Sequence, residues 1–115
     1  MSLRLVGVED AGNLDSERVV LRADAAIGIG RSILLHAKRS PDGKVFSGPV
    51  PGAYWFATME VGAGDLVVLY TKRGERSQKP QDDGATSHFF YWGLPAPIWG
   101  PDHKPALVSA AGWTW

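Results

Sequence analysis

Short segments in which apolar and polar residues alternate predict strands along most of the chain. In Glu17–Asp24, the side chains of Val19, Leu21 and Ala23 fall on one face of an extended strand. Charged residues occupy most of the other face, so one face is expected to meet a core and the other to meet water. Leu66–Thr71 is almost wholly apolar and follows a glycine turn. This second pattern predicts a central strand that is covered on both faces.

An aromatic run, Ser87–Trp99, is expected to supply the other central strand. Phe89, Phe90 and Tyr91 are consecutive there, and Trp92 follows them directly. Aromatic side chains of this size fill the space between two packed sheets. The tryptophans expected in the core are Trp55, Trp92 and Trp99.

Further strands are predicted wherever β-branched or alternating runs lie between turn residues. Arg31–Arg39 fits a helix or a strand by periodicity, and we interpret it as a strand because Pro41 closes it. Asp42-Gly43 then follows as a hairpin signal before Lys44–Phe46. The other expected strands are Leu3–Val8, Ala53–Glu60 and Ala106–Ser109.

Several segments are expected to bend or to connect strands. Ala25–Gly30 contains two glycines and suits a bend or bulge. Gly93–Pro101 contains three prolines that exclude a helix, so we interpret it as an extended crossing, with a turn at Asp102–Lys104. Lys72–Thr86 has no apolar residue except Ala85 and predicts a long exposed loop.

These elements together predict the fold class. About eight short strands separated by turn residues, with no convincing helix, favour a sandwich or barrel. We expect an all-β, immunoglobulin-like two-sheet β-sandwich of about seven to nine strands. It would be one domain that spans residues 1–115.

Composition and charge narrow the functional classes. Twelve basic residues balance twelve acidic ones, so no electrostatic footprint for nucleic acid or an anionic membrane stands out. The chain has no cysteine, which excludes a disulfide framework and a thiolate zinc site. The first residues lack the apolar region of a secretory signal, and no run is long enough to span a bilayer. We therefore expect a cytoplasmic protein.

The order of the predicted elements resembles the lamin tail domain, an immunoglobulin-like β-sandwich that also occurs in bacterial proteins. Two departures lie at Gly100-Pro101, where the family has asparagines, and at His103–Pro105, where it has a small polar turn. The family carries no catalytic residues, so the resemblance implies an interaction or anchoring module and not an enzyme. The matching segments are Glu17–Leu21, Ile29-Gly30, Ile33–Leu35, Asp42-Gly43, Val61–Thr71, Phe90–Gly93, Ile98-Trp99 and Asp102–Val108.

Several patterns that carry chemistry in other proteins are incomplete here. Gly28-Ile29-Gly30 lacks the third glycine of a phosphate-binding loop, since Ile33 stands in that place and no helix is expected to follow. His36, His88 and His103 lie far apart without ligand spacing, so we interpret them as scattered surface or edge residues. We therefore expect no metal site and no cofactor.

A hydrolase triad is also not expected. Asp102 and His103 with Ser87 or Ser109 would be the candidates, but adjacent residues in one tight turn rarely give the required geometry. The chain has no nucleophile elbow of the G-x-S-x-G type.

Six residues are candidates for an interaction surface. Trp113 and Trp115 share one side of any strand near the end of the chain. They would either close this domain's own sandwich as its last strand or cover a second subunit or a ligand such as a sugar ring. The other candidates are Lys72, Arg73 and Arg76 in the charged loop, and Trp99 in the proline-rich connection. The loop cations are interrupted by acids, which favours a solvated loop over a nucleic-acid arm.

The function expected from the sequence is a non-enzymatic protein-interaction or structural module. Its partner would be another protein or a second copy of the chain, bound through a strand edge or the segment Trp113–Trp115. No nucleic-acid or membrane partner is expected. The alternative is a module that binds a carbohydrate or a small ligand through exposed tryptophans.

Overall fold

The computed structural model describes residues 1–45 and 48–115 and consists almost entirely of strands and loops. In the described part, the one helical element is a single 3-10 turn, Ile29–Arg31, and no helix is long and apolar enough to cross a membrane. The strands are β1 (Leu3–Glu9), β2 (Arg18–Ala23), β3 (Ile27–Gly28), β4 (Ser32–Lys38), β5 (Gly52–Trp55), β6 (Glu60–Val61), β7 (Leu66–Tyr70), β8 (Ser77–Pro80), β9 (Thr86–Tyr91) and β10 (His103–Ser109). The expected all-β class is confirmed.

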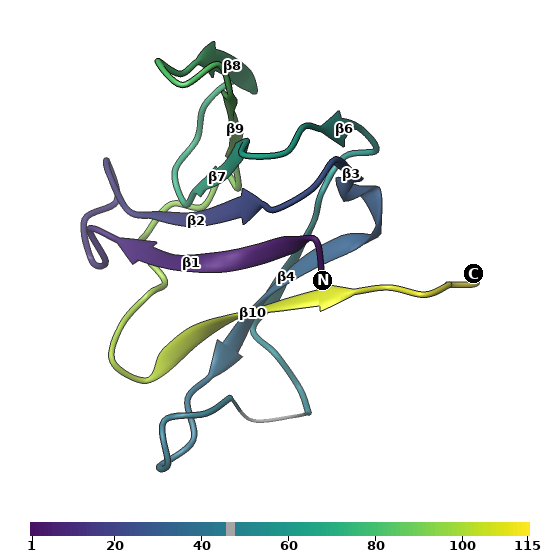
Figure 1. Cartoon of the computed structure of the whole chain (residues 1–115). Helices are drawn as coiled ribbons and strands as arrows, with labels where there is room; N and C mark the ends of the chain where they lie inside the picture. The colour runs from purple at the N-terminus through teal and green to yellow at the C-terminus, as the bar shows by residue number, and fades with distance from the viewer. Residues whose placement is uncertain (46–47) are drawn as a thin grey trace.

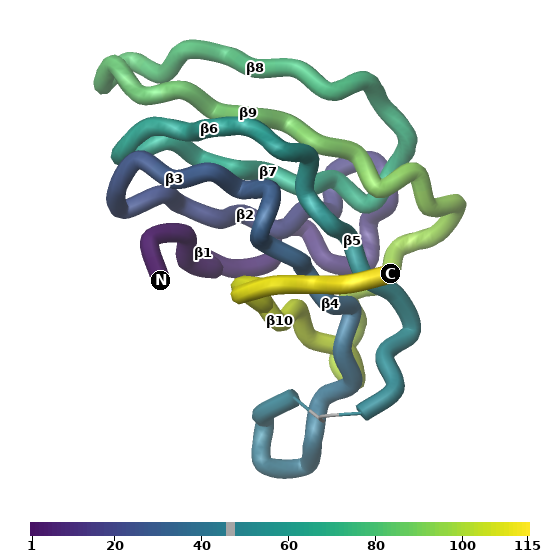
Figure 2. The backbone as a smooth tube through the Cα atoms, turned by 90° about the vertical axis from the view of Figure 1, so that its right-hand side faces the viewer, coloured from purple at the N-terminus to yellow at the C-terminus, as the bar shows by residue number. Residues whose placement is uncertain are grey.

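Two sheets pack face to face, and a short ribbon lies at their right-hand ends in Figure 1. The larger sheet has the order β1-β2-β7-β9-β8, which Figure 2 shows from the lower to the upper side of the molecule. The smaller sheet has the order β10-β4-β5, and β3 pairs with β6 in the ribbon. All neighbouring strands are antiparallel except β7 and β9, which run parallel. The sandwich therefore has β1 and β8 as the two edges of its larger sheet.

The core lies between the sheets and contains the residues that alternate inward. Val19, Leu21 and Ala23 of β2 are fully buried, as the alternation in their segment predicts. Phe90 of β9 meets Phe56 with its ring centroid 5.4 Å away in an edge-to-face contact. The remaining buried members of this cluster are Leu3, Ile29, Leu34, Val61, Val67, Leu69 and Trp99.

The strand interpretation of Arg31–Arg39 is confirmed by β4. This strand is central in the smaller sheet, because β10 pairs with one edge of it and β5 with the other. The hairpin expected after Asp42-Gly43 is reduced to one bridge between Arg39 and Val45. The last residue of that expected strand, Phe46, lies outside the described residues.

Four expectations about local structure are corrected. Lys72–Thr86 is not one long loop, since it contains β8, which pairs antiparallel with β9 through polar residues. Ala53–Glu60 is split between β5 and β6. The turn expected at Asp102–Lys104 ends earlier, because β10 begins at His103. Trp113–Trp115 forms no strand, so these residues do not close the sandwich.

Trp55 is a further correction. It was expected in the core, but its side chain is 49% exposed on the outside of the smaller sheet. Its indole nitrogen donates a hydrogen bond to the carbonyl oxygen of Gly30, 2.7 Å away. Trp92 packs partly buried against the core and Trp99 is 4% exposed, as expected.

A buried carboxylate, Glu17, ties together three connections at one end of the sandwich. Its side chain accepts hydrogen bonds from the backbone amide of Gly12 at 2.9 Å and from the hydroxyl of Thr71 at 2.5 Å. It also accepts from the amides of Ile98 and Trp99, at 3.1 and 3.2 Å. Glu17 has no exposed surface, and its four donors replace the water that an ionised carboxylate would otherwise bind.

We predict that Glu17→Ala destabilises the fold by at least about 3 kcal/mol, because four hydrogen-bond donors, two in buried and two in partly buried contacts, lose their acceptor. Urea unfolding followed by circular dichroism measures the change. Asp15→Ala is the matched control in the neighbouring turn: this side chain is exposed, and the expected change is below about 0.5 kcal/mol. Equal unfolding midpoints for both variants would contradict the role assigned to Glu17.

Candidate functional site

A groove runs along the side of the sandwich between β1 and β10, the outer strands of the two sheets. Figure 1 shows β10 below β1 with both strands at this side of the molecule. The groove has a volume of about 600 Å³. Its apolar lining comes from Leu5, Val6, Val8, Trp99, Pro101 and Pro105.

A β-bulge in β1 shapes this groove. The pairing of β1 with β2 shifts register between Leu5 and Gly7, which leaves Val6 as the extra residue. The side chain of Val6 is 52% exposed and lines the groove. Bulges of this kind increase the twist of an edge strand and redirect a side chain, so this apolar residue is turned toward the open side.

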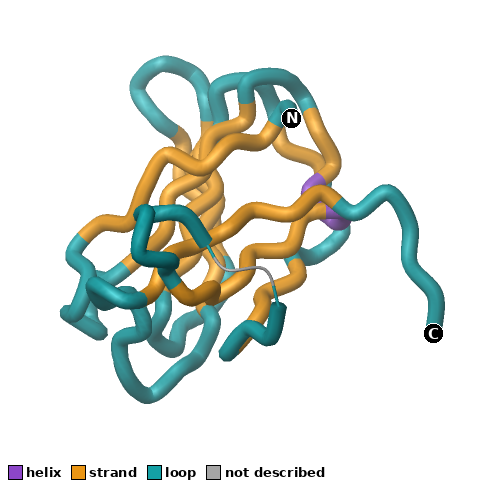
Figure 3. Tube along the Cα trace, turned by 90° about the horizontal axis from the view of Figure 1, so that it is seen from below, coloured by secondary structure: helices purple, strands orange, loops and turns teal. Residues whose placement is uncertain are grey.

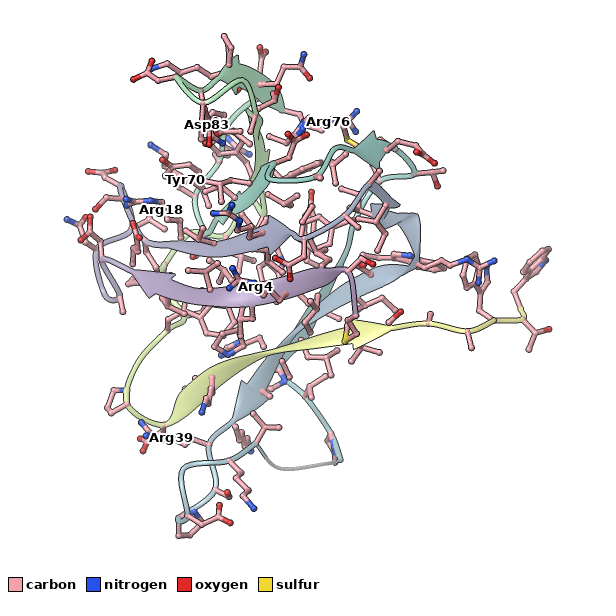
Figure 4. All side chains as sticks on the ribbon, viewed as in Figure 1. Arg4, Arg18, Arg39, Tyr70, Arg76 and Asp83 are labelled. Atoms are coloured by element: carbon pink, nitrogen blue, oxygen red, sulfur yellow. The ribbon has the colours of Figure 1, made fainter. Side chains whose placement is uncertain are left out.

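The charged residues that line the groove are all basic. They are Arg39 and Lys104, and none of the described lining residues is Asp or Glu. The ammonium of Lys104 donates to the carbonyl oxygen of Gly43 at 3.0 Å. Arg39, labelled in Figure 4 beside the start of β10, forms no ion pair with the described residues. This charge bias is local, since the whole chain has a formal net charge of zero.

Two histidines lie together behind the groove. The ring centroids of His36 and His103 are 4.5 Å apart, and His36 also makes an edge contact with Trp99 at 5.2 Å. Burial and then the neighbouring His103 lower the pKa of His36, while the negative charge of Glu17 and a hydrogen bond to the backbone of Ile98 oppose this shift. The Nε2 atom of His36 and the Nδ1 atom of His103 are buried and have no partner among the described residues.

A second site lies on the larger sheet where β9 meets the turn before β7. His88 is buried, and its Nε2 atom is 2.9 Å from Oδ2 of Asp65. Asp65 also accepts from the amides of Gly62 and Thr86, both at 2.9 Å. Burial alone would raise the pKa of Asp65, but the hydrogen bonds from His88 and the two amides outweigh it and lower that pKa.

The glycine turn before β7 creates this arrangement. Gly64 has a φ of +87°, a left-handed conformation that glycine adopts without strain. The turn places the amide of Gly62 at hydrogen-bond distance from the carboxylate of Asp65, which directly precedes the buried strand β7. His88 reaches the same carboxylate because β9 runs parallel to β7 with Val67 opposite His88.

A small hollow opens beside His88, with a volume of about 240 Å³. Phe90 lines it two residues further along β9, and Arg76 places its guanidinium carbon 5.5 Å from the centroid of that ring. Gln78 of β8 lines it as well and is the direct register partner of His88. Burial raises the pKa of Tyr54, and the positive charge of Arg76 opposes this effect. We call this site the His88 pocket.

The predicted interaction residues are distributed over several places. Trp113 and Trp115 lie in the segment that leads away from the body after β10 (Figure 3). Trp113 is half exposed and meets Trp55 edge-to-face at 4.9 Å, while the guanidinium of Arg31 lies 5.6 Å from its ring centroid. Trp115 is fully exposed.

The remaining candidates separate further. The ammonium of Lys72 lies 5.4 Å from the centroid of the Tyr70 ring, and Lys72 and its exposed neighbour Arg73 both line a further surface hollow with Leu14. Arg76 belongs to the His88 pocket. Trp99 is not on a binding loop surface: it is buried and reaches the groove only from within.

The interpretation of the histidines as scattered surface or edge residues is wrong for His88, which is buried, and for His36, which lies on the central strand β4, whereas His103 does lie on the edge strand β10. His36 and His103 are in contact, and His88 is buried against Asp65. Within residues 1–45 and 48–115, no group of three or more His, Asp or Glu side chains could hold a metal ion. The available signal was the alternation in β9, which places His88 on the same inward face as Phe90.

Comparison with known proteins gives one match. No protein-family model matches the chain, and no solved structure matches it significantly. A curated protein of Rhizobium rhizogenes (strain K84 / ATCC BAA-868), named 4-hydroxy-tetrahydrodipicolinate reductase, is 37% identical over 94 residues. The aligned part covers 79% of this chain and 34% of that protein, so the chain spans about a third of the length of this relative.

This similarity corrects one expectation from the sequence. The chain was expected not to be an enzyme. The relative that matches 79% of this chain carries the name of an enzyme. The expectation rested on the lamin tail resemblance, which neither comparison tests. That resemblance therefore stays a prediction.

We predict that the free energy of unfolding falls as the pH decreases from about 7.5 to about 5.5, in part because of His36. The pKa of His36 is lowered in the fold from its ordinary value of 6.5, so below that value the unfolded chain binds more protons than the folded one. Urea unfolding across this range measures the slope. In His36→Gln the slope should be smaller, and an unchanged slope would contradict the prediction.

Removal of Trp113–Trp115 is expected to leave the fold intact, since these residues belong to no sheet. The loss of the Trp55 contact and of the Arg31 contact should cost about 1–2 kcal/mol. Circular dichroism and urea unfolding check this result. Trp99→Ala is the control for a core tryptophan, with an expected loss of about 3–5 kcal/mol. Unfolding of the shortened chain would show that the segment is part of the core.

Proposed function

We propose that this chain is a recognition domain that binds an extended segment of a partner protein in the groove between β1 and β10. The observation that carries the proposal is the composition of the groove: an apolar floor between two edge strands, with basic residues and no acidic ones among its described lining. Such a surface suits a segment in which apolar and acidic residues alternate.

The position of the groove at two strand edges supports an extended ligand. β1 and β10 each pair with one neighbour in their sheet, so each has one edge that is not used by its sheet. Backbone groups at such an edge can hydrogen-bond to an added strand, and alternate side chains of that strand then enter the groove. The bulge at Val6 interrupts the regular edge of β1, which limits long strand pairing and favours a short segment.

The setting of this function is an enzyme or an enzyme complex. The relative named as a reductase is about three times as long as the matching part of this chain. We propose that this β-sandwich binds a segment of a partner protein within such an enzyme or enzyme complex. The substrate and the activity belong to the whole assembly. The absence of cysteine supports a reducing compartment such as the cytoplasm. The resemblance to a lamin tail domain supports an interaction role.

A second candidate is a site for a carbohydrate at Trp55 and Trp113, because both indoles are half exposed. The two rings meet at an interplanar angle of 86°, so they do not form one flat platform. A sugar ring would stack on one of them at a time, which gives less contact than a continuous aromatic surface. Quenching of tryptophan fluorescence by oligosaccharides would support this candidate over the groove.

The groove is tested with two octapeptides of equal length, one alternating valine with glutamate and one alternating valine with lysine. We expect the acidic peptide to shift the amide NMR signals of β1 and β10 in the isotope-labelled chain. The double variant Arg39→Glu, Lys104→Glu should bind it about 3- to 10-fold more weakly, since two attractive charges become repulsive.

The matched control is the double variant Arg22→Glu, Lys79→Glu, which changes the net charge equally at exposed positions outside the groove. It should bind like the unchanged chain. Equal responses to both peptides, or signals that move elsewhere, would contradict the proposal. Concentration-dependent dimerisation through the same strands without peptide would assign the groove to a second copy of the chain instead.

A further inference from the structure

We propose that the His88 pocket is a general-base site for a small 2-oxo carboxylate. In this role the imidazole of His88 removes a proton from the carbon next to the ketone. The inference is independent of the groove, because β1 and β8 are opposite edges of the larger sheet. Figure 4 accordingly labels Arg76 at the other end of the view from Arg39.

The histidine is held in one orientation with one nitrogen free. Nε2 lies at hydrogen-bond distance from the carboxylate of Asp65, which two backbone amides fix in place. A neutral imidazole that donates from Nε2 carries its lone pair on Nδ1. Nδ1 forms no hydrogen bond with the described residues, and it is not one of their fully buried polar atoms that lack a partner. The side chain of His88 lines the pocket. A carboxylate behind the ring also stabilises the imidazolium that forms when Nδ1 takes a proton.

Three side chains converge on the pocket, from β8, from β9 and from the residue that directly precedes β8. Gln78 is opposite His88 in the antiparallel pair of β8 and β9, so their side chains share a face of the sheet. Arg76 precedes Gln78 by two residues and lies over Phe90, which follows His88 by two residues. The pocket therefore presents a base, an amide and a guanidinium above an aromatic floor.

The guanidinium is suited to a carboxylate. Arg76 is exposed and forms no ion pair within the part of the chain that the structure describes. A planar guanidinium binds a carboxylate through two parallel hydrogen bonds, which fixes the orientation of a small acid. With a volume of about 240 Å³, the pocket is smaller than the usual sites for drug-sized ligands and suits a molecule of few heavy atoms.

The proton transfer can be written without any further reactant. The C–H bond breaks and its proton passes to Nδ1 of His88. The electron pair forms the enolate, whose charge develops on the ketone oxygen. The amide of Gln78 can donate a hydrogen bond to that oxygen, and Arg76 holds the carboxylate. Return of a proton from the imidazolium to the carbon regenerates both the ketone and the neutral base.

Deuterium exchange tests this proposal with pyruvate as the probe. In D₂O, the protons of its methyl group should be replaced by deuterium faster than without protein, which proton NMR follows as loss of the methyl signal. His88→Gln should lower the protein-dependent rate by about 100-fold or more, the range that a positioned base contributes. Circular dichroism confirms that this variant remains folded.

Two further variants allow the proposal to be tested even if His88→Gln is poorly folded. Arg76→Gln changes an exposed side chain and should raise the pyruvate concentration for half-maximal rate about 10-fold with a smaller effect on the maximal rate. Arg73→Gln, at an exposed position in the same connection that does not line the pocket, is its matched control and should leave both values unchanged.

Asp65 is a positioning residue, and its role has a spectroscopic readout. Nitrogen NMR of the histidine ring should report a proton on Nε2 in the unchanged chain and a mixture of tautomers in Asp65→Asn, together with slower exchange. No exchange of pyruvate by the unchanged chain would overturn the proposal. It would also be overturned if His88→Gln or Arg76→Gln exchanged pyruvate like the Arg73→Gln control.

Discussion

The carboxylate of Glu17 is the interaction on which the arrangement of the sandwich depends. A buried charge without water must receive hydrogen bonds in the protein, and the four donors here come from three separate connections. These connections have no common pattern of apolar residues, so hydrophobic burial alone would not fix their positions relative to one another. The backbone carbonyl of Glu17 also accepts from the amide of Thr71, so the residue anchors the end of β7 with main chain as well as side chain.

The groove depends on this anchor through the segment between β9 and β10. The amides of Ile98 and Trp99 are bound to Glu17, which fixes Trp99 between the core and the groove. Pro101 and His103 follow within four residues and line the same groove. A proline-rich connection has few backbone donors for a sheet, so a buried acceptor is an effective way to hold it. The shape of the groove and the stability of the fold are therefore coupled at one residue.

Strands with their own hydrophobic pattern could be predicted from the sequence, and elements that depend on a neighbour could not. The alternation in β2 and the apolar run in β7 identify buried faces directly. β8 has four exposed residues and forms because β9 offers it an edge, which no local pattern records. Trp55 looked like a core residue by its size, but its neighbour Phe56 takes the inward position. The contact of Asp65 with His88 depends on the parallel pairing of β7 and β9 across 23 residues, and periodicity within one segment cannot reveal it.

The order of strands in the larger sheet separates two kinds of surface. At the β1 edge, apolar side chains and unpaired cations suit an extended ligand, whereas at the β8 edge a buried acid and histidine adjoin a small hollow. Because the groove and the His88 pocket have no lining residue in common, a change at one site need not disturb the other. A small β-sandwich can thus combine recognition with proton transfer. Similarity to part of a protein that is named as an enzyme is compatible with that combination, because it does not require this chain to contain the whole reaction.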